Sequence, residues 1–418
     1  MKIIGVIAEY NPFHLGHQYH LNRVKAEIKP DGIICVMSGN FVQRGGPAIF
    51  DKWSRAEMAL KGGADLILEL PTCFATSTAE IFAESSIRLL AETKMVTGLS
   101  FGVEEYHEKV FLTLSKLLSD EPQPFKNLVK TYLKKGISFP TAREKAVIEY
   151  ISKHEPWHDT KLIEEFIKKP NFILALEYMK AINKLRTQFL IFPVIRKGPN
   201  YHEKKEINGF LSATGIRNAM MQNSGTSFKT IRGLPNSSID IINREMALGR
   251  GPIFIKDFEE FILYILRRTP IKELNLFFDV GEGLENRIKK ASIVSSSLEQ
   301  LISAIKTKRY PETKVSRILT HILLNVRKDL VASRKPMYFR VLGLSTKGAK
   351  ILKQIKKRSC LPILSRASDF SLLNDNAKKM LNTDVLAYDI YSLAFKNPAY
   401  KIGGADMRKK VIYYKDSR

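Results

Sequence analysis

Short apolar runs rich in β-branched residues recur along the first half of the chain, and stretches with helical periodicity separate most of them. The runs are nearly continuous and do not alternate with polar residues, which is typical of parallel strands with both faces covered. The pattern therefore predicts an α/β fold on a parallel, Rossmann-like sheet, whose ligands bind at the carboxyl ends of the strands. The predicted strands are residues 3–8, 32–37, 64–70, 98–101 and 189–195.

The remaining segments are predicted to be mainly helical. Residues 105–188 have the pattern of a helical insertion before the fifth strand, with prolines at the breaks between helices. Loop-like residues after 222 place a boundary near 225, so we expect a first domain at 1–225 and a mostly helical second domain at 226–418. In the second domain the pattern predicts helices at about 254–267, 284–307, 311–330 and 372–396 and a strand–helix–strand unit at 338–364.

The polar residues with the clearest chemistry follow the first strand. Asn11-Pro12 favours a turn and the residues from His17 onward are helical, so His14 and His17 lie where a strand passes into a helix. Main-chain N–H groups at a helix N-terminus attract phosphate, and Gly16 lacks the Cβ that would keep a nucleotide away from the backbone. Two imidazoles three residues apart can hydrogen-bond a phosphate as negative charge builds up on it. This arrangement predicts an ATP-adenylylating site.

The same histidines have two alternative interpretations, a zinc site and a purely structural role. His14, His17 and His20 follow one another at intervals of three residues, but the first and last of them lie far apart around a helix. No cysteine or carboxylate cluster completes a tetrahedral ligand set. We therefore expect no protein-bound metal at this position.

Charge is distributed unevenly along the chain. The formal net charge is +25, yet residues 1–100 hold ten basic and ten acidic side chains, whereas residues 301–418 hold 26 Lys and Arg against eight Asp and Glu. Such an excess is expected of a surface that binds nucleic acid, because neutralising phosphates releases counterions. Lysines that only solvate the surface, and binding to anionic lipid, are the alternatives.

Size and cysteine content agree with a globular, cytoplasmic protein. The chain has 418 residues with 44% hydrophobic content, enough for two or three domains. Cys35, Cys73 and Cys360 are too few and too scattered for a disulfide framework or a zinc knuckle. The N-terminal apolar run is too short for a signal peptide, and no apolar run approaches the ~18 residues of a membrane span. We expect no association with a membrane.

Several segments resemble a known family. Asn-Pro-Phe-His-x-Gly-His after a first strand is the signature of the HIGH-type nucleotidylyltransferases, and further segments narrow the resemblance to the tRNA(Met) cytidine acetate ligases. The resemblance covers most of residues 1–220 and much less of the C-terminal part. The segments are 11–17, Met-Ser-Gly-Asn-Phe-Val-Gln-Arg-Gly at 37–45, Asp-Lys-Trp-Ser-Arg at 51–55, Leu-Glu-Leu-Pro at 68–71, Ser-Phe-Gly-Val-Glu at 100–104 and Ser-Ala-Thr-Gly-Ile-Arg at 212–217.

The resemblance implies a two-step reaction. Acetate and ATP, with Mg²⁺ on the nucleotide, would give acetyl-adenylate and pyrophosphate, and the acetyl group would pass to N4 of the wobble cytidine of elongator tRNA(Met) to form N4-acetylcytidine. Acetyl-CoA is not needed. The motif Gln-x-x-Gly-x-Ala at 43–48 also fits an acetyl-CoA pyrophosphate loop, but Pro47 removes an N–H group that such a loop needs. A small-substrate adenylyltransferase of cofactor synthesis, or a non-catalytic RNA-binding protein on a nucleotide-binding fold, is the alternative function.

The resemblance also implies roles for particular residues. His14 and His17 would act on the α-phosphate and Arg217 on the departing pyrophosphate, because hydroxyls, helix-terminal N–H groups and one fixed cation suit that task. A capped helix without a ligand is the alternative interpretation of residues 212–217. Arg44 would bind acetate or phosphate, with Lys52 and Arg55 adding positive charge. The implied ATP-binding residues are Ile7, Ala8, Glu9, Tyr10, Asn11, Pro12, Phe13, His14, Leu15, Gly16, His17, Gln18, Tyr19, His20, Gly102, Asn171, Arg196, Ser212 and Thr214, and exposed lysines expected to contact tRNA are Lys347, Lys353, Lys356 and Lys357.

Overall fold

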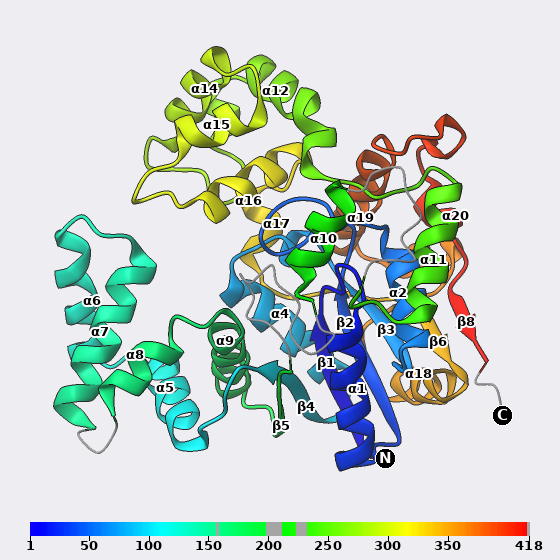
Figure 1. Cartoon of the computed structure of the whole chain (residues 1–418), viewed down its shortest axis with the longest axis horizontal. Helices are drawn as coiled ribbons and strands as arrows, with labels where there is room; N and C mark the ends of the chain where they lie inside the picture. The colour runs from blue at the N-terminus through cyan, green and yellow to red at the C-terminus, as the bar shows by residue number, and fades with distance from the viewer. Residues whose placement is uncertain (156–158, 198–210, 223–231, 416–418) are drawn as a thin grey trace.

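The computed structural model describes residues 1–155, 159–197, 211–222 and 232–415 and is built around one sheet (Figure 1). All five strands predicted in the first half of the chain are present, and three more follow residue 338. The strands are β1 Ile3–Ala8, β2 Gly32–Ser38, β3 Leu66–Leu70, β4 Val96–Val103, β5 Leu190–Ile195, β6 Phe339–Ser345, β7 Ile363–Leu364 and β8 Ile412–Tyr414.

The strand order is β5-β4-β1-β2-β3-β6-β7, with β8 also paired to β6. Strands β1 to β5 are mutually parallel, which confirms the predicted α/β class. The chain proceeds from β1 outward through β2 and β3 on one side, and β4 and β5 continue on the other. The order therefore reverses beside β1, and this is where open α/β sheets bind their ligands.

Helices cover both faces of the sheet. Ile4 and Val6 of β1 face one apolar layer, whereas Ile3 faces the other, because successive strand residues point to opposite sides. The first layer packs against α1 Leu15–Ile28, α2 Lys52–Lys61, α10 Ala213–Gln222 and α11 Asn236–Ala247. The second layer packs against α3 Thr72–Ala75, α4 Ala79–Glu92 and α18 Thr346–Arg358, among others.

The predicted helical insertion is present and stands at one side of the sheet (Figure 1). Prolines lie in the first turns of three of its helices, where the missing N–H group removes no helical hydrogen bond. No helix in the described ranges is long and apolar enough to cross a membrane. The insertion consists of α5 Glu108–Asp120, α6 Gln123–Lys134, α7 Phe139–His154, α8 Thr160–Phe166 and α9 Pro170–Leu185.

Residues 255–332 form a second group of helices, above the sheet in Figure 1. The sequence predicts one helix over 284–307, but the structure has two, because Ser297 caps a new helix by accepting a hydrogen bond from Gln300 N at 3.2 Å. The group contains the 3-10 helix η2 Ile255–Phe258 and the helices α12 Glu259–Arg268, α13 Ile271–Leu274, α14 Leu284–Val294, α15 Leu298–Ile305, α16 Glu312–Leu323 and α17 Lys328–Ala332.

The last part of the chain returns to the sheet. β6 runs antiparallel to β3, so residues from beyond the expected boundary near 225 extend the sheet of the first half. The predicted strand–helix–strand unit is confirmed as β6, α18 and β7, whereas β8 was not predicted. The remaining elements are η3 Ala367–Leu372, α19 Asp375–Ser392, η4 Pro398–Tyr400 and α20 Ala405–Arg408.

A buried ion cluster ties this returning segment to the sheet. Lys52 Nζ lies 2.8 Å from Glu69 Oε1 and 2.9 Å from Asp406 Oδ2, and Arg340 Nη2 lies 2.8 Å from the same aspartate oxygen. Trp53 Nε1 donates a hydrogen bond to the other aspartate oxygen at 3.0 Å. Lys52 is 1% exposed, so it stabilises the fold and does not add charge to a ligand site as the resemblance implied.

Candidate active site

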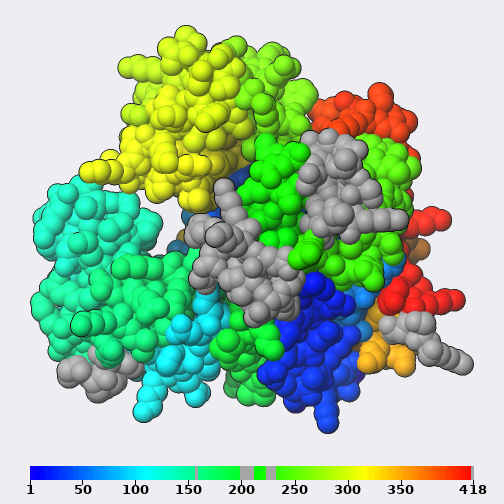
Figure 2. Space-filling view, viewed as in Figure 1, coloured from blue at the N-terminus to red at the C-terminus, as the bar shows by residue number. Residues whose placement is uncertain are grey.

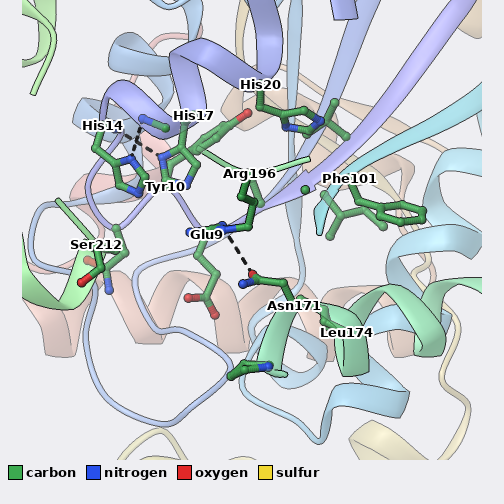
Figure 3. Close-up of a pocket in the computed structure, with 18 of the residues that line it drawn as sticks. Glu9, Tyr10, His14, His17, His20, Phe101, Asn171, Leu174, Arg196 and Ser212 are labelled. Atoms are coloured by element: carbon green, nitrogen blue, oxygen red, sulfur yellow. Dashed lines mark hydrogen bonds between the residues drawn. The ribbon is translucent and has the colours of Figure 1, made fainter. Parts of the chain in front are cut away.

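A cavity of about 410 Å³ opens at the carboxyl ends of β1, β4 and β5, beside the point where the strand order reverses (Figure 3). Its walls come from segments that are far apart in the sequence, including the first loop, the loop after β2 and the first turns of α9 and α10. Most of the residues that the sequence analysis expects in the site line this cavity. They are Ile7, Ala8, Glu9, Tyr10, Asn11, His14, Gly16, His17, Tyr19, His20, Arg44, Gly102, Asn171, Arg196, Ser212 and Arg217.

The other expected ATP-binding residues do not line the cavity. Phe13 is fully buried and packs against the imidazole of His17, with ring centroids 5.6 Å apart. Leu15 N donates a hydrogen bond to Gly233 O at 2.8 Å, and Thr214 accepts one from Arg217. Pro12 and Gln18 are likewise absent from the lining.

His14 and His17 cap the start of α1 and stack on each other. Gly16 N donates to His14 Nδ1 at 3.0 Å, and His14 N donates to His17 Nδ1 at 3.2 Å. The ring centroids are 3.8 Å apart and the planes are 24° from parallel. Because both Nδ1 atoms accept main-chain N–H groups, the proton of each neutral ring is on Nε2. Both histidines therefore present Nε2–H as a hydrogen-bond donor.

The surroundings keep these imidazoles neutral. Burial, with smaller contributions from Arg196 and Arg217, lowers the pKa of His14 to about 3. Burial and the neighbouring His14, Arg196 and His20 also lower the pKa of His17 well below its usual value. A neutral Nε2–H still donates to a phosphate oxygen, and it gains strength as charge develops on that oxygen.

His20 is oriented by a short hydrogen-bond chain. Ser100 Oγ donates to Phe192 O at 2.7 Å, so it accepts from His20 Nε2, which lies 2.8 Å away. The pKa of His20 is lowered to about 4, first by burial and then by Arg196. Its neutral ring consequently keeps a lone pair on Nδ1.

Two arginines that line the cavity hold fixed positions. Arg217 Nη1 donates to Asn11 O at 2.9 Å and Nη2 donates to Thr214 Oγ1 at 3.0 Å, which joins α10 to the first loop. Arg196 follows β5 and its Nη1 lies 3.5 Å from Asn171 Oδ1, as drawn in Figure 3. Ser212 Oγ accepts from Gly215 N at 3.0 Å, so the predicted helix cap is present.

Sequence reasoning gave Glu104 no role and expected Arg55 to add positive charge to the ligand site, whereas both residues position the site. Glu104 Oε1 accepts hydrogen bonds from Asn171 Nδ2 at 2.6 Å and Asn171 N at 3.3 Å, and so aims that amide at Arg196. Arg55 is fully buried and donates to the carbonyls of Glu9, Ser38, Gly39 and Phe50, which joins the loops after β1 and β2. Arg55 therefore shapes the loops around the cavity and does not line it.

The loop after β2 brings Arg44 to the cavity and rests on the second helical group. Gly46 N donates to Thr320 Oγ1 of α16 at 2.8 Å. Gly45 has a φ of +82°, and a Cβ there would lie 2.4 Å from the main chain of Ser316, so only glycine fits this contact. Arg44 itself is half-buried.

Gly102, which the resemblance implies contacts ATP, lines the cavity beside Arg196. A Cβ at Gly102 would lie 3.3 Å from Cγ of Arg196, so a side chain there would crowd the arginine. Among the described residues, no group of three or more His, Cys, Asp or Glu side chains is placed to hold a metal ion.

The four lysines expected to contact tRNA are all exposed on α18. Ser345, which caps this helix, donates a hydrogen bond from Oγ to Asp65 Oδ1 at 2.8 Å. Asp65 directly precedes β3, so the helix begins at the amino ends of the strands, whereas the cavity opens at their carboxyl ends. The lysines are therefore accessible but do not border the cavity. They are Lys347, Lys353, Lys356 and Lys357.

Comparisons with known proteins agree with this geometry over the whole chain. The family profile described as HIGH Nucleotidyl Transferase matches residues 1–406. A tRNA(Met) cytidine acetate ligase of Thermoanaerobacter sp. is 41% identical over 99% of this chain and 100% of the relative, and that of Acetivibrio thermocellus is 38% identical over the same shares.

Solved structures give the same assignment. Thermotoga maritima TmcAL in its apo form superposes with a TM-score of 0.94 at 32% identity, and the match covers 99% of this chain and 100% of that one. The same protein bound with alpha-thio ATP superposes with a TM-score of 0.92, again at 32% identity and with the same coverage. The chain belongs to the HIGH nucleotidyl transferases and, within them, to the family of the tRNA(Met) cytidine acetate ligases.

Proposed function

We propose that this protein activates acetate with ATP and transfers the acetyl group to N4 of the wobble cytidine of elongator tRNA(Met). The observation that carries the proposal is the pair of neutral, stacked imidazoles of His14 and His17, whose Nε2–H groups are fixed by two main-chain hydrogen bonds at the end of β1. The relatives named as ligases of this type, and the related structure bound with alpha-thio ATP, support the choice of substrates.

In the activation step, an acetate oxygen attacks the α-phosphate and pyrophosphate leaves. The Nε2–H donors of His14 and His17 stabilise the charge that builds up on the α-phosphate oxygens. Arg217 and the first turn of α10 hold the β- and γ-phosphates, and Arg196, after β5, also supports the nucleotide. Arg44, on the loop after β2, is the proposed cation for acetate or phosphate.

Mg²⁺ would bind through the nucleotide. One carboxylate, Glu9, is found among the described residues that line the cavity, too few to build a Mg²⁺ site, so the triphosphate oxygens and water would supply the ligands. When bound, the ion supplies positive charge to the leaving pyrophosphate. The ion and the fixed arginines would together neutralise the charge of the triphosphate.

The tRNA would be held mainly by the basic C-terminal half, including α18. Residues 301–418 carry 26 Lys and Arg against eight Asp and Glu, whereas the first 100 residues are balanced. We propose a division of labour in which residues 1–225 carry out activation and 226–418 bind tRNA, although both parts share one sheet. A cytoplasmic location follows from this substrate.

The experiment is to measure acetate-dependent ATP–pyrophosphate exchange without tRNA, and then N4-acetylcytidine in elongator tRNA(Met) by mass spectrometry. We expect exchange that requires acetate and acetylcytidine that requires ATP and acetate but no acetyl-CoA. Exchange with another small acid and none with acetate would identify a different adenylyltransferase. Tight RNA binding without exchange would identify a non-catalytic RNA-binding protein.

A further inference from the structure

The cavity contains one carboxylate in a lining that is otherwise cationic or neutral. Glu9 is the only acidic residue among the described lining residues, whereas Arg44, Arg196, Lys197 and Arg217 all contribute positive charge. Phosphate and acetate are anions, so a carboxylate in their cavity opposes binding through like-charge repulsion. The position of Glu9 therefore calls for a function other than holding the triphosphate.

The Glu9 side chain is fixed and points into the cavity. Its Oε1 accepts a hydrogen bond from Gln43 N at 2.9 Å, and the amide of Gln43 donates to Ser77 O at 3.1 Å. Arg55 holds the Glu9 carbonyl. Figure 3 shows the carboxylate between Ser212 and Asn171. Within the described parts of the chain, the side-chain hydrogen bond of Glu9 is made by Oε1, and Oε2 has no hydrogen-bond partner.

Proton balance indicates which step needs a base. Acetate reacts with ATP as the carboxylate, so activation releases no proton from it. In the transfer step, N4 of cytidine forms a bond to the acetyl carbon, the bond from that carbon to the AMP oxygen breaks, and AMP leaves as the anion. The attacking amino group must lose one of its two protons, and a positioned base accelerates this loss.

The histidines at the α-phosphate have no lone pair for that proton. The Nδ1 atoms of His14 and His17 already accept main-chain N–H groups, and their Nε2 atoms carry the hydrogens. His20 keeps a lone pair on Nδ1, but its Nε2 is hydrogen-bonded to Ser100 on β4. Among the described residues that line the cavity, Oε2 of Glu9 is the anionic acceptor.

We propose that Glu9 is the general base of the transfer step and that its Oε2 takes the proton from N4 of the cytidine. The proposal rests on the proposed function and adds a catalytic residue to its second half. Activation requires no base, so Glu9 contributes to one half-reaction and not to the other.

The test separates the two half-reactions in the full-length protein. Hydroxylamine traps acetyl-adenylate as acetohydroxamate, which reports activation without tRNA. Glu9→Gln keeps the Oε1 acceptor for Gln43 N but removes the base. We expect acetylation of tRNA to fall by about 10²- to 10⁴-fold, the usual contribution of a general base, while hydroxamate formation and tRNA affinity change far less. Glu108→Gln, at an exposed position at the start of α5, is the matched control and retains both reactions.

Each other outcome overturns the assignment. An equal loss of hydroxamate formation, or an increased Mg²⁺ requirement for it, would place Glu9 in nucleotide or metal binding. Unchanged acetylation in Glu9→Gln, with loss in His20→Gln, would make His20 the base. Weaker tRNA binding would mean that Glu9 helps to bind tRNA and is not the base. Failure of the wild-type protein to form hydroxamate from acetate would instead refute the proposed function.

Discussion

Gly16 and His14 are in contact across the first turn of α1. A Cβ on Gly16 would lie 2.8 Å from Cε1 and 3.0 Å from Nδ1 of the His14 ring, and the Gly16 N–H group donates to that same Nδ1. The absence of a side chain at Gly16 therefore leaves room for the imidazole, and the Gly16 N–H group orients it. The sequence predicted this glycine for close approach of a nucleotide, and its contact with His14 is a separate reason for it.

We expect Gly16→Ala to slow acetate-dependent pyrophosphate exchange by at least about tenfold without unfolding the protein. The added methyl group displaces the His14 ring, whereas alanine in a helix is more favourable than glycine by roughly 0.5–1 kcal/mol. Exchange and chemical denaturation measure the two effects. Gly281→Ala is the control, because the nearest atom to its Cβ is 4.0 Å away. Normal exchange in Gly16→Ala would show that the ring orientation does not matter.

His17→Asn separates the two hydrogen bonds of this imidazole. An asparagine oxygen takes the place of Nδ1 and still accepts from His14 N, but no group replaces Nε2–H. We expect exchange to fall by ~10²-fold or more, the scale for losing one preorganised donor, while the denaturation midpoint and tRNA affinity stay near wild type. His17→Ala loses the cap as well and should also be less stable. Exchange near the wild-type rate in either variant would contradict the role of His17.

Arg217→Ala should slow activation by ~10²-fold or more, because a fixed cation no longer stabilises the leaving pyrophosphate. Preformed acetyl-adenylate should restore transfer to tRNA. Arg217→Lys keeps the charge but cannot bond both Asn11 O and Thr214 Oγ1, so it should recover only part of the rate. If added acetyl-adenylate fails to rescue transfer, Arg217 acts in RNA binding or folding.

Charge reversal of the four exposed lysines on α18 should weaken tRNA binding and flatten its salt dependence. Each lost phosphate contact lowers the log–log salt slope by roughly 0.7 to 0.9. Exchange without tRNA should stay normal, because α18 begins at the amino ends of the strands, whereas the cavity opens at their carboxyl ends. An unchanged slope would show that α18 is only a solvated surface. The variant reverses Lys347, Lys353, Lys356 and Lys357.

A second reversal with the same change in net charge controls for overall electrostatics. The helical insertion offers four lysines that are equally exposed, at and just after α6. If both variants lose the same affinity, the effect comes from total charge and not from a contact surface. The control variant reverses Lys126, Lys130, Lys134 and Lys135.

Stability should fall as the pH drops below 6.5, in part through His321. Burial is the main cause that lowers the pKa of His321 to about 4, and Arg317 also lowers it. Hydrogen bonds to the Thr76 and Phe278 carbonyls and the charge of Asp279 raise the pKa by less. Below pH 6.5 the unfolded chain binds a proton that the folded chain does not, so folding loses about 2 kcal/mol from this residue by pH 5. His321→Gln should show a smaller loss between pH 7.5 and 5 in urea denaturation. An identical pH dependence would contradict this.

The sequence predicted the parts of the fold that local patterns encode. The strands β1 to β5 were found because each is a short, nearly continuous apolar run, although β5 is largely exposed, and three prolines marked helix starts in the insertion. β8 is only three residues long and carries no such signal. The antiparallel direction of β6 depends on its pairing with β3, and no local pattern specifies that pairing.

The sequence likewise identified the residues of the candidate site that lie in local motifs, but not those that depend on distant contacts. His14, His17 and Arg217 were recognisable because each lies in a short motif at the start of a helix. Glu104 was given no role and Arg55 was expected to add charge to the ligand site, because both act through partners that are distant in the sequence, such as Asn171 and Glu9, and no local pattern reveals these contacts. Lys52 was misjudged for the same reason, since its partner Asp406 lies at the other end of the chain.

The pairing of β3 with β6 also has a consequence for how the protein is made. During synthesis, the whole nucleotide site, up to Arg217, emerges from the ribosome well before β6 does. Until then β3 is an open edge that can pair with other chains, and the buried Lys52 and Glu69 lack Arg340 and Asp406. A nascent chain that stalls before residue 338 is therefore prone to aggregation, and the catalytic sheet matures only when synthesis is almost finished.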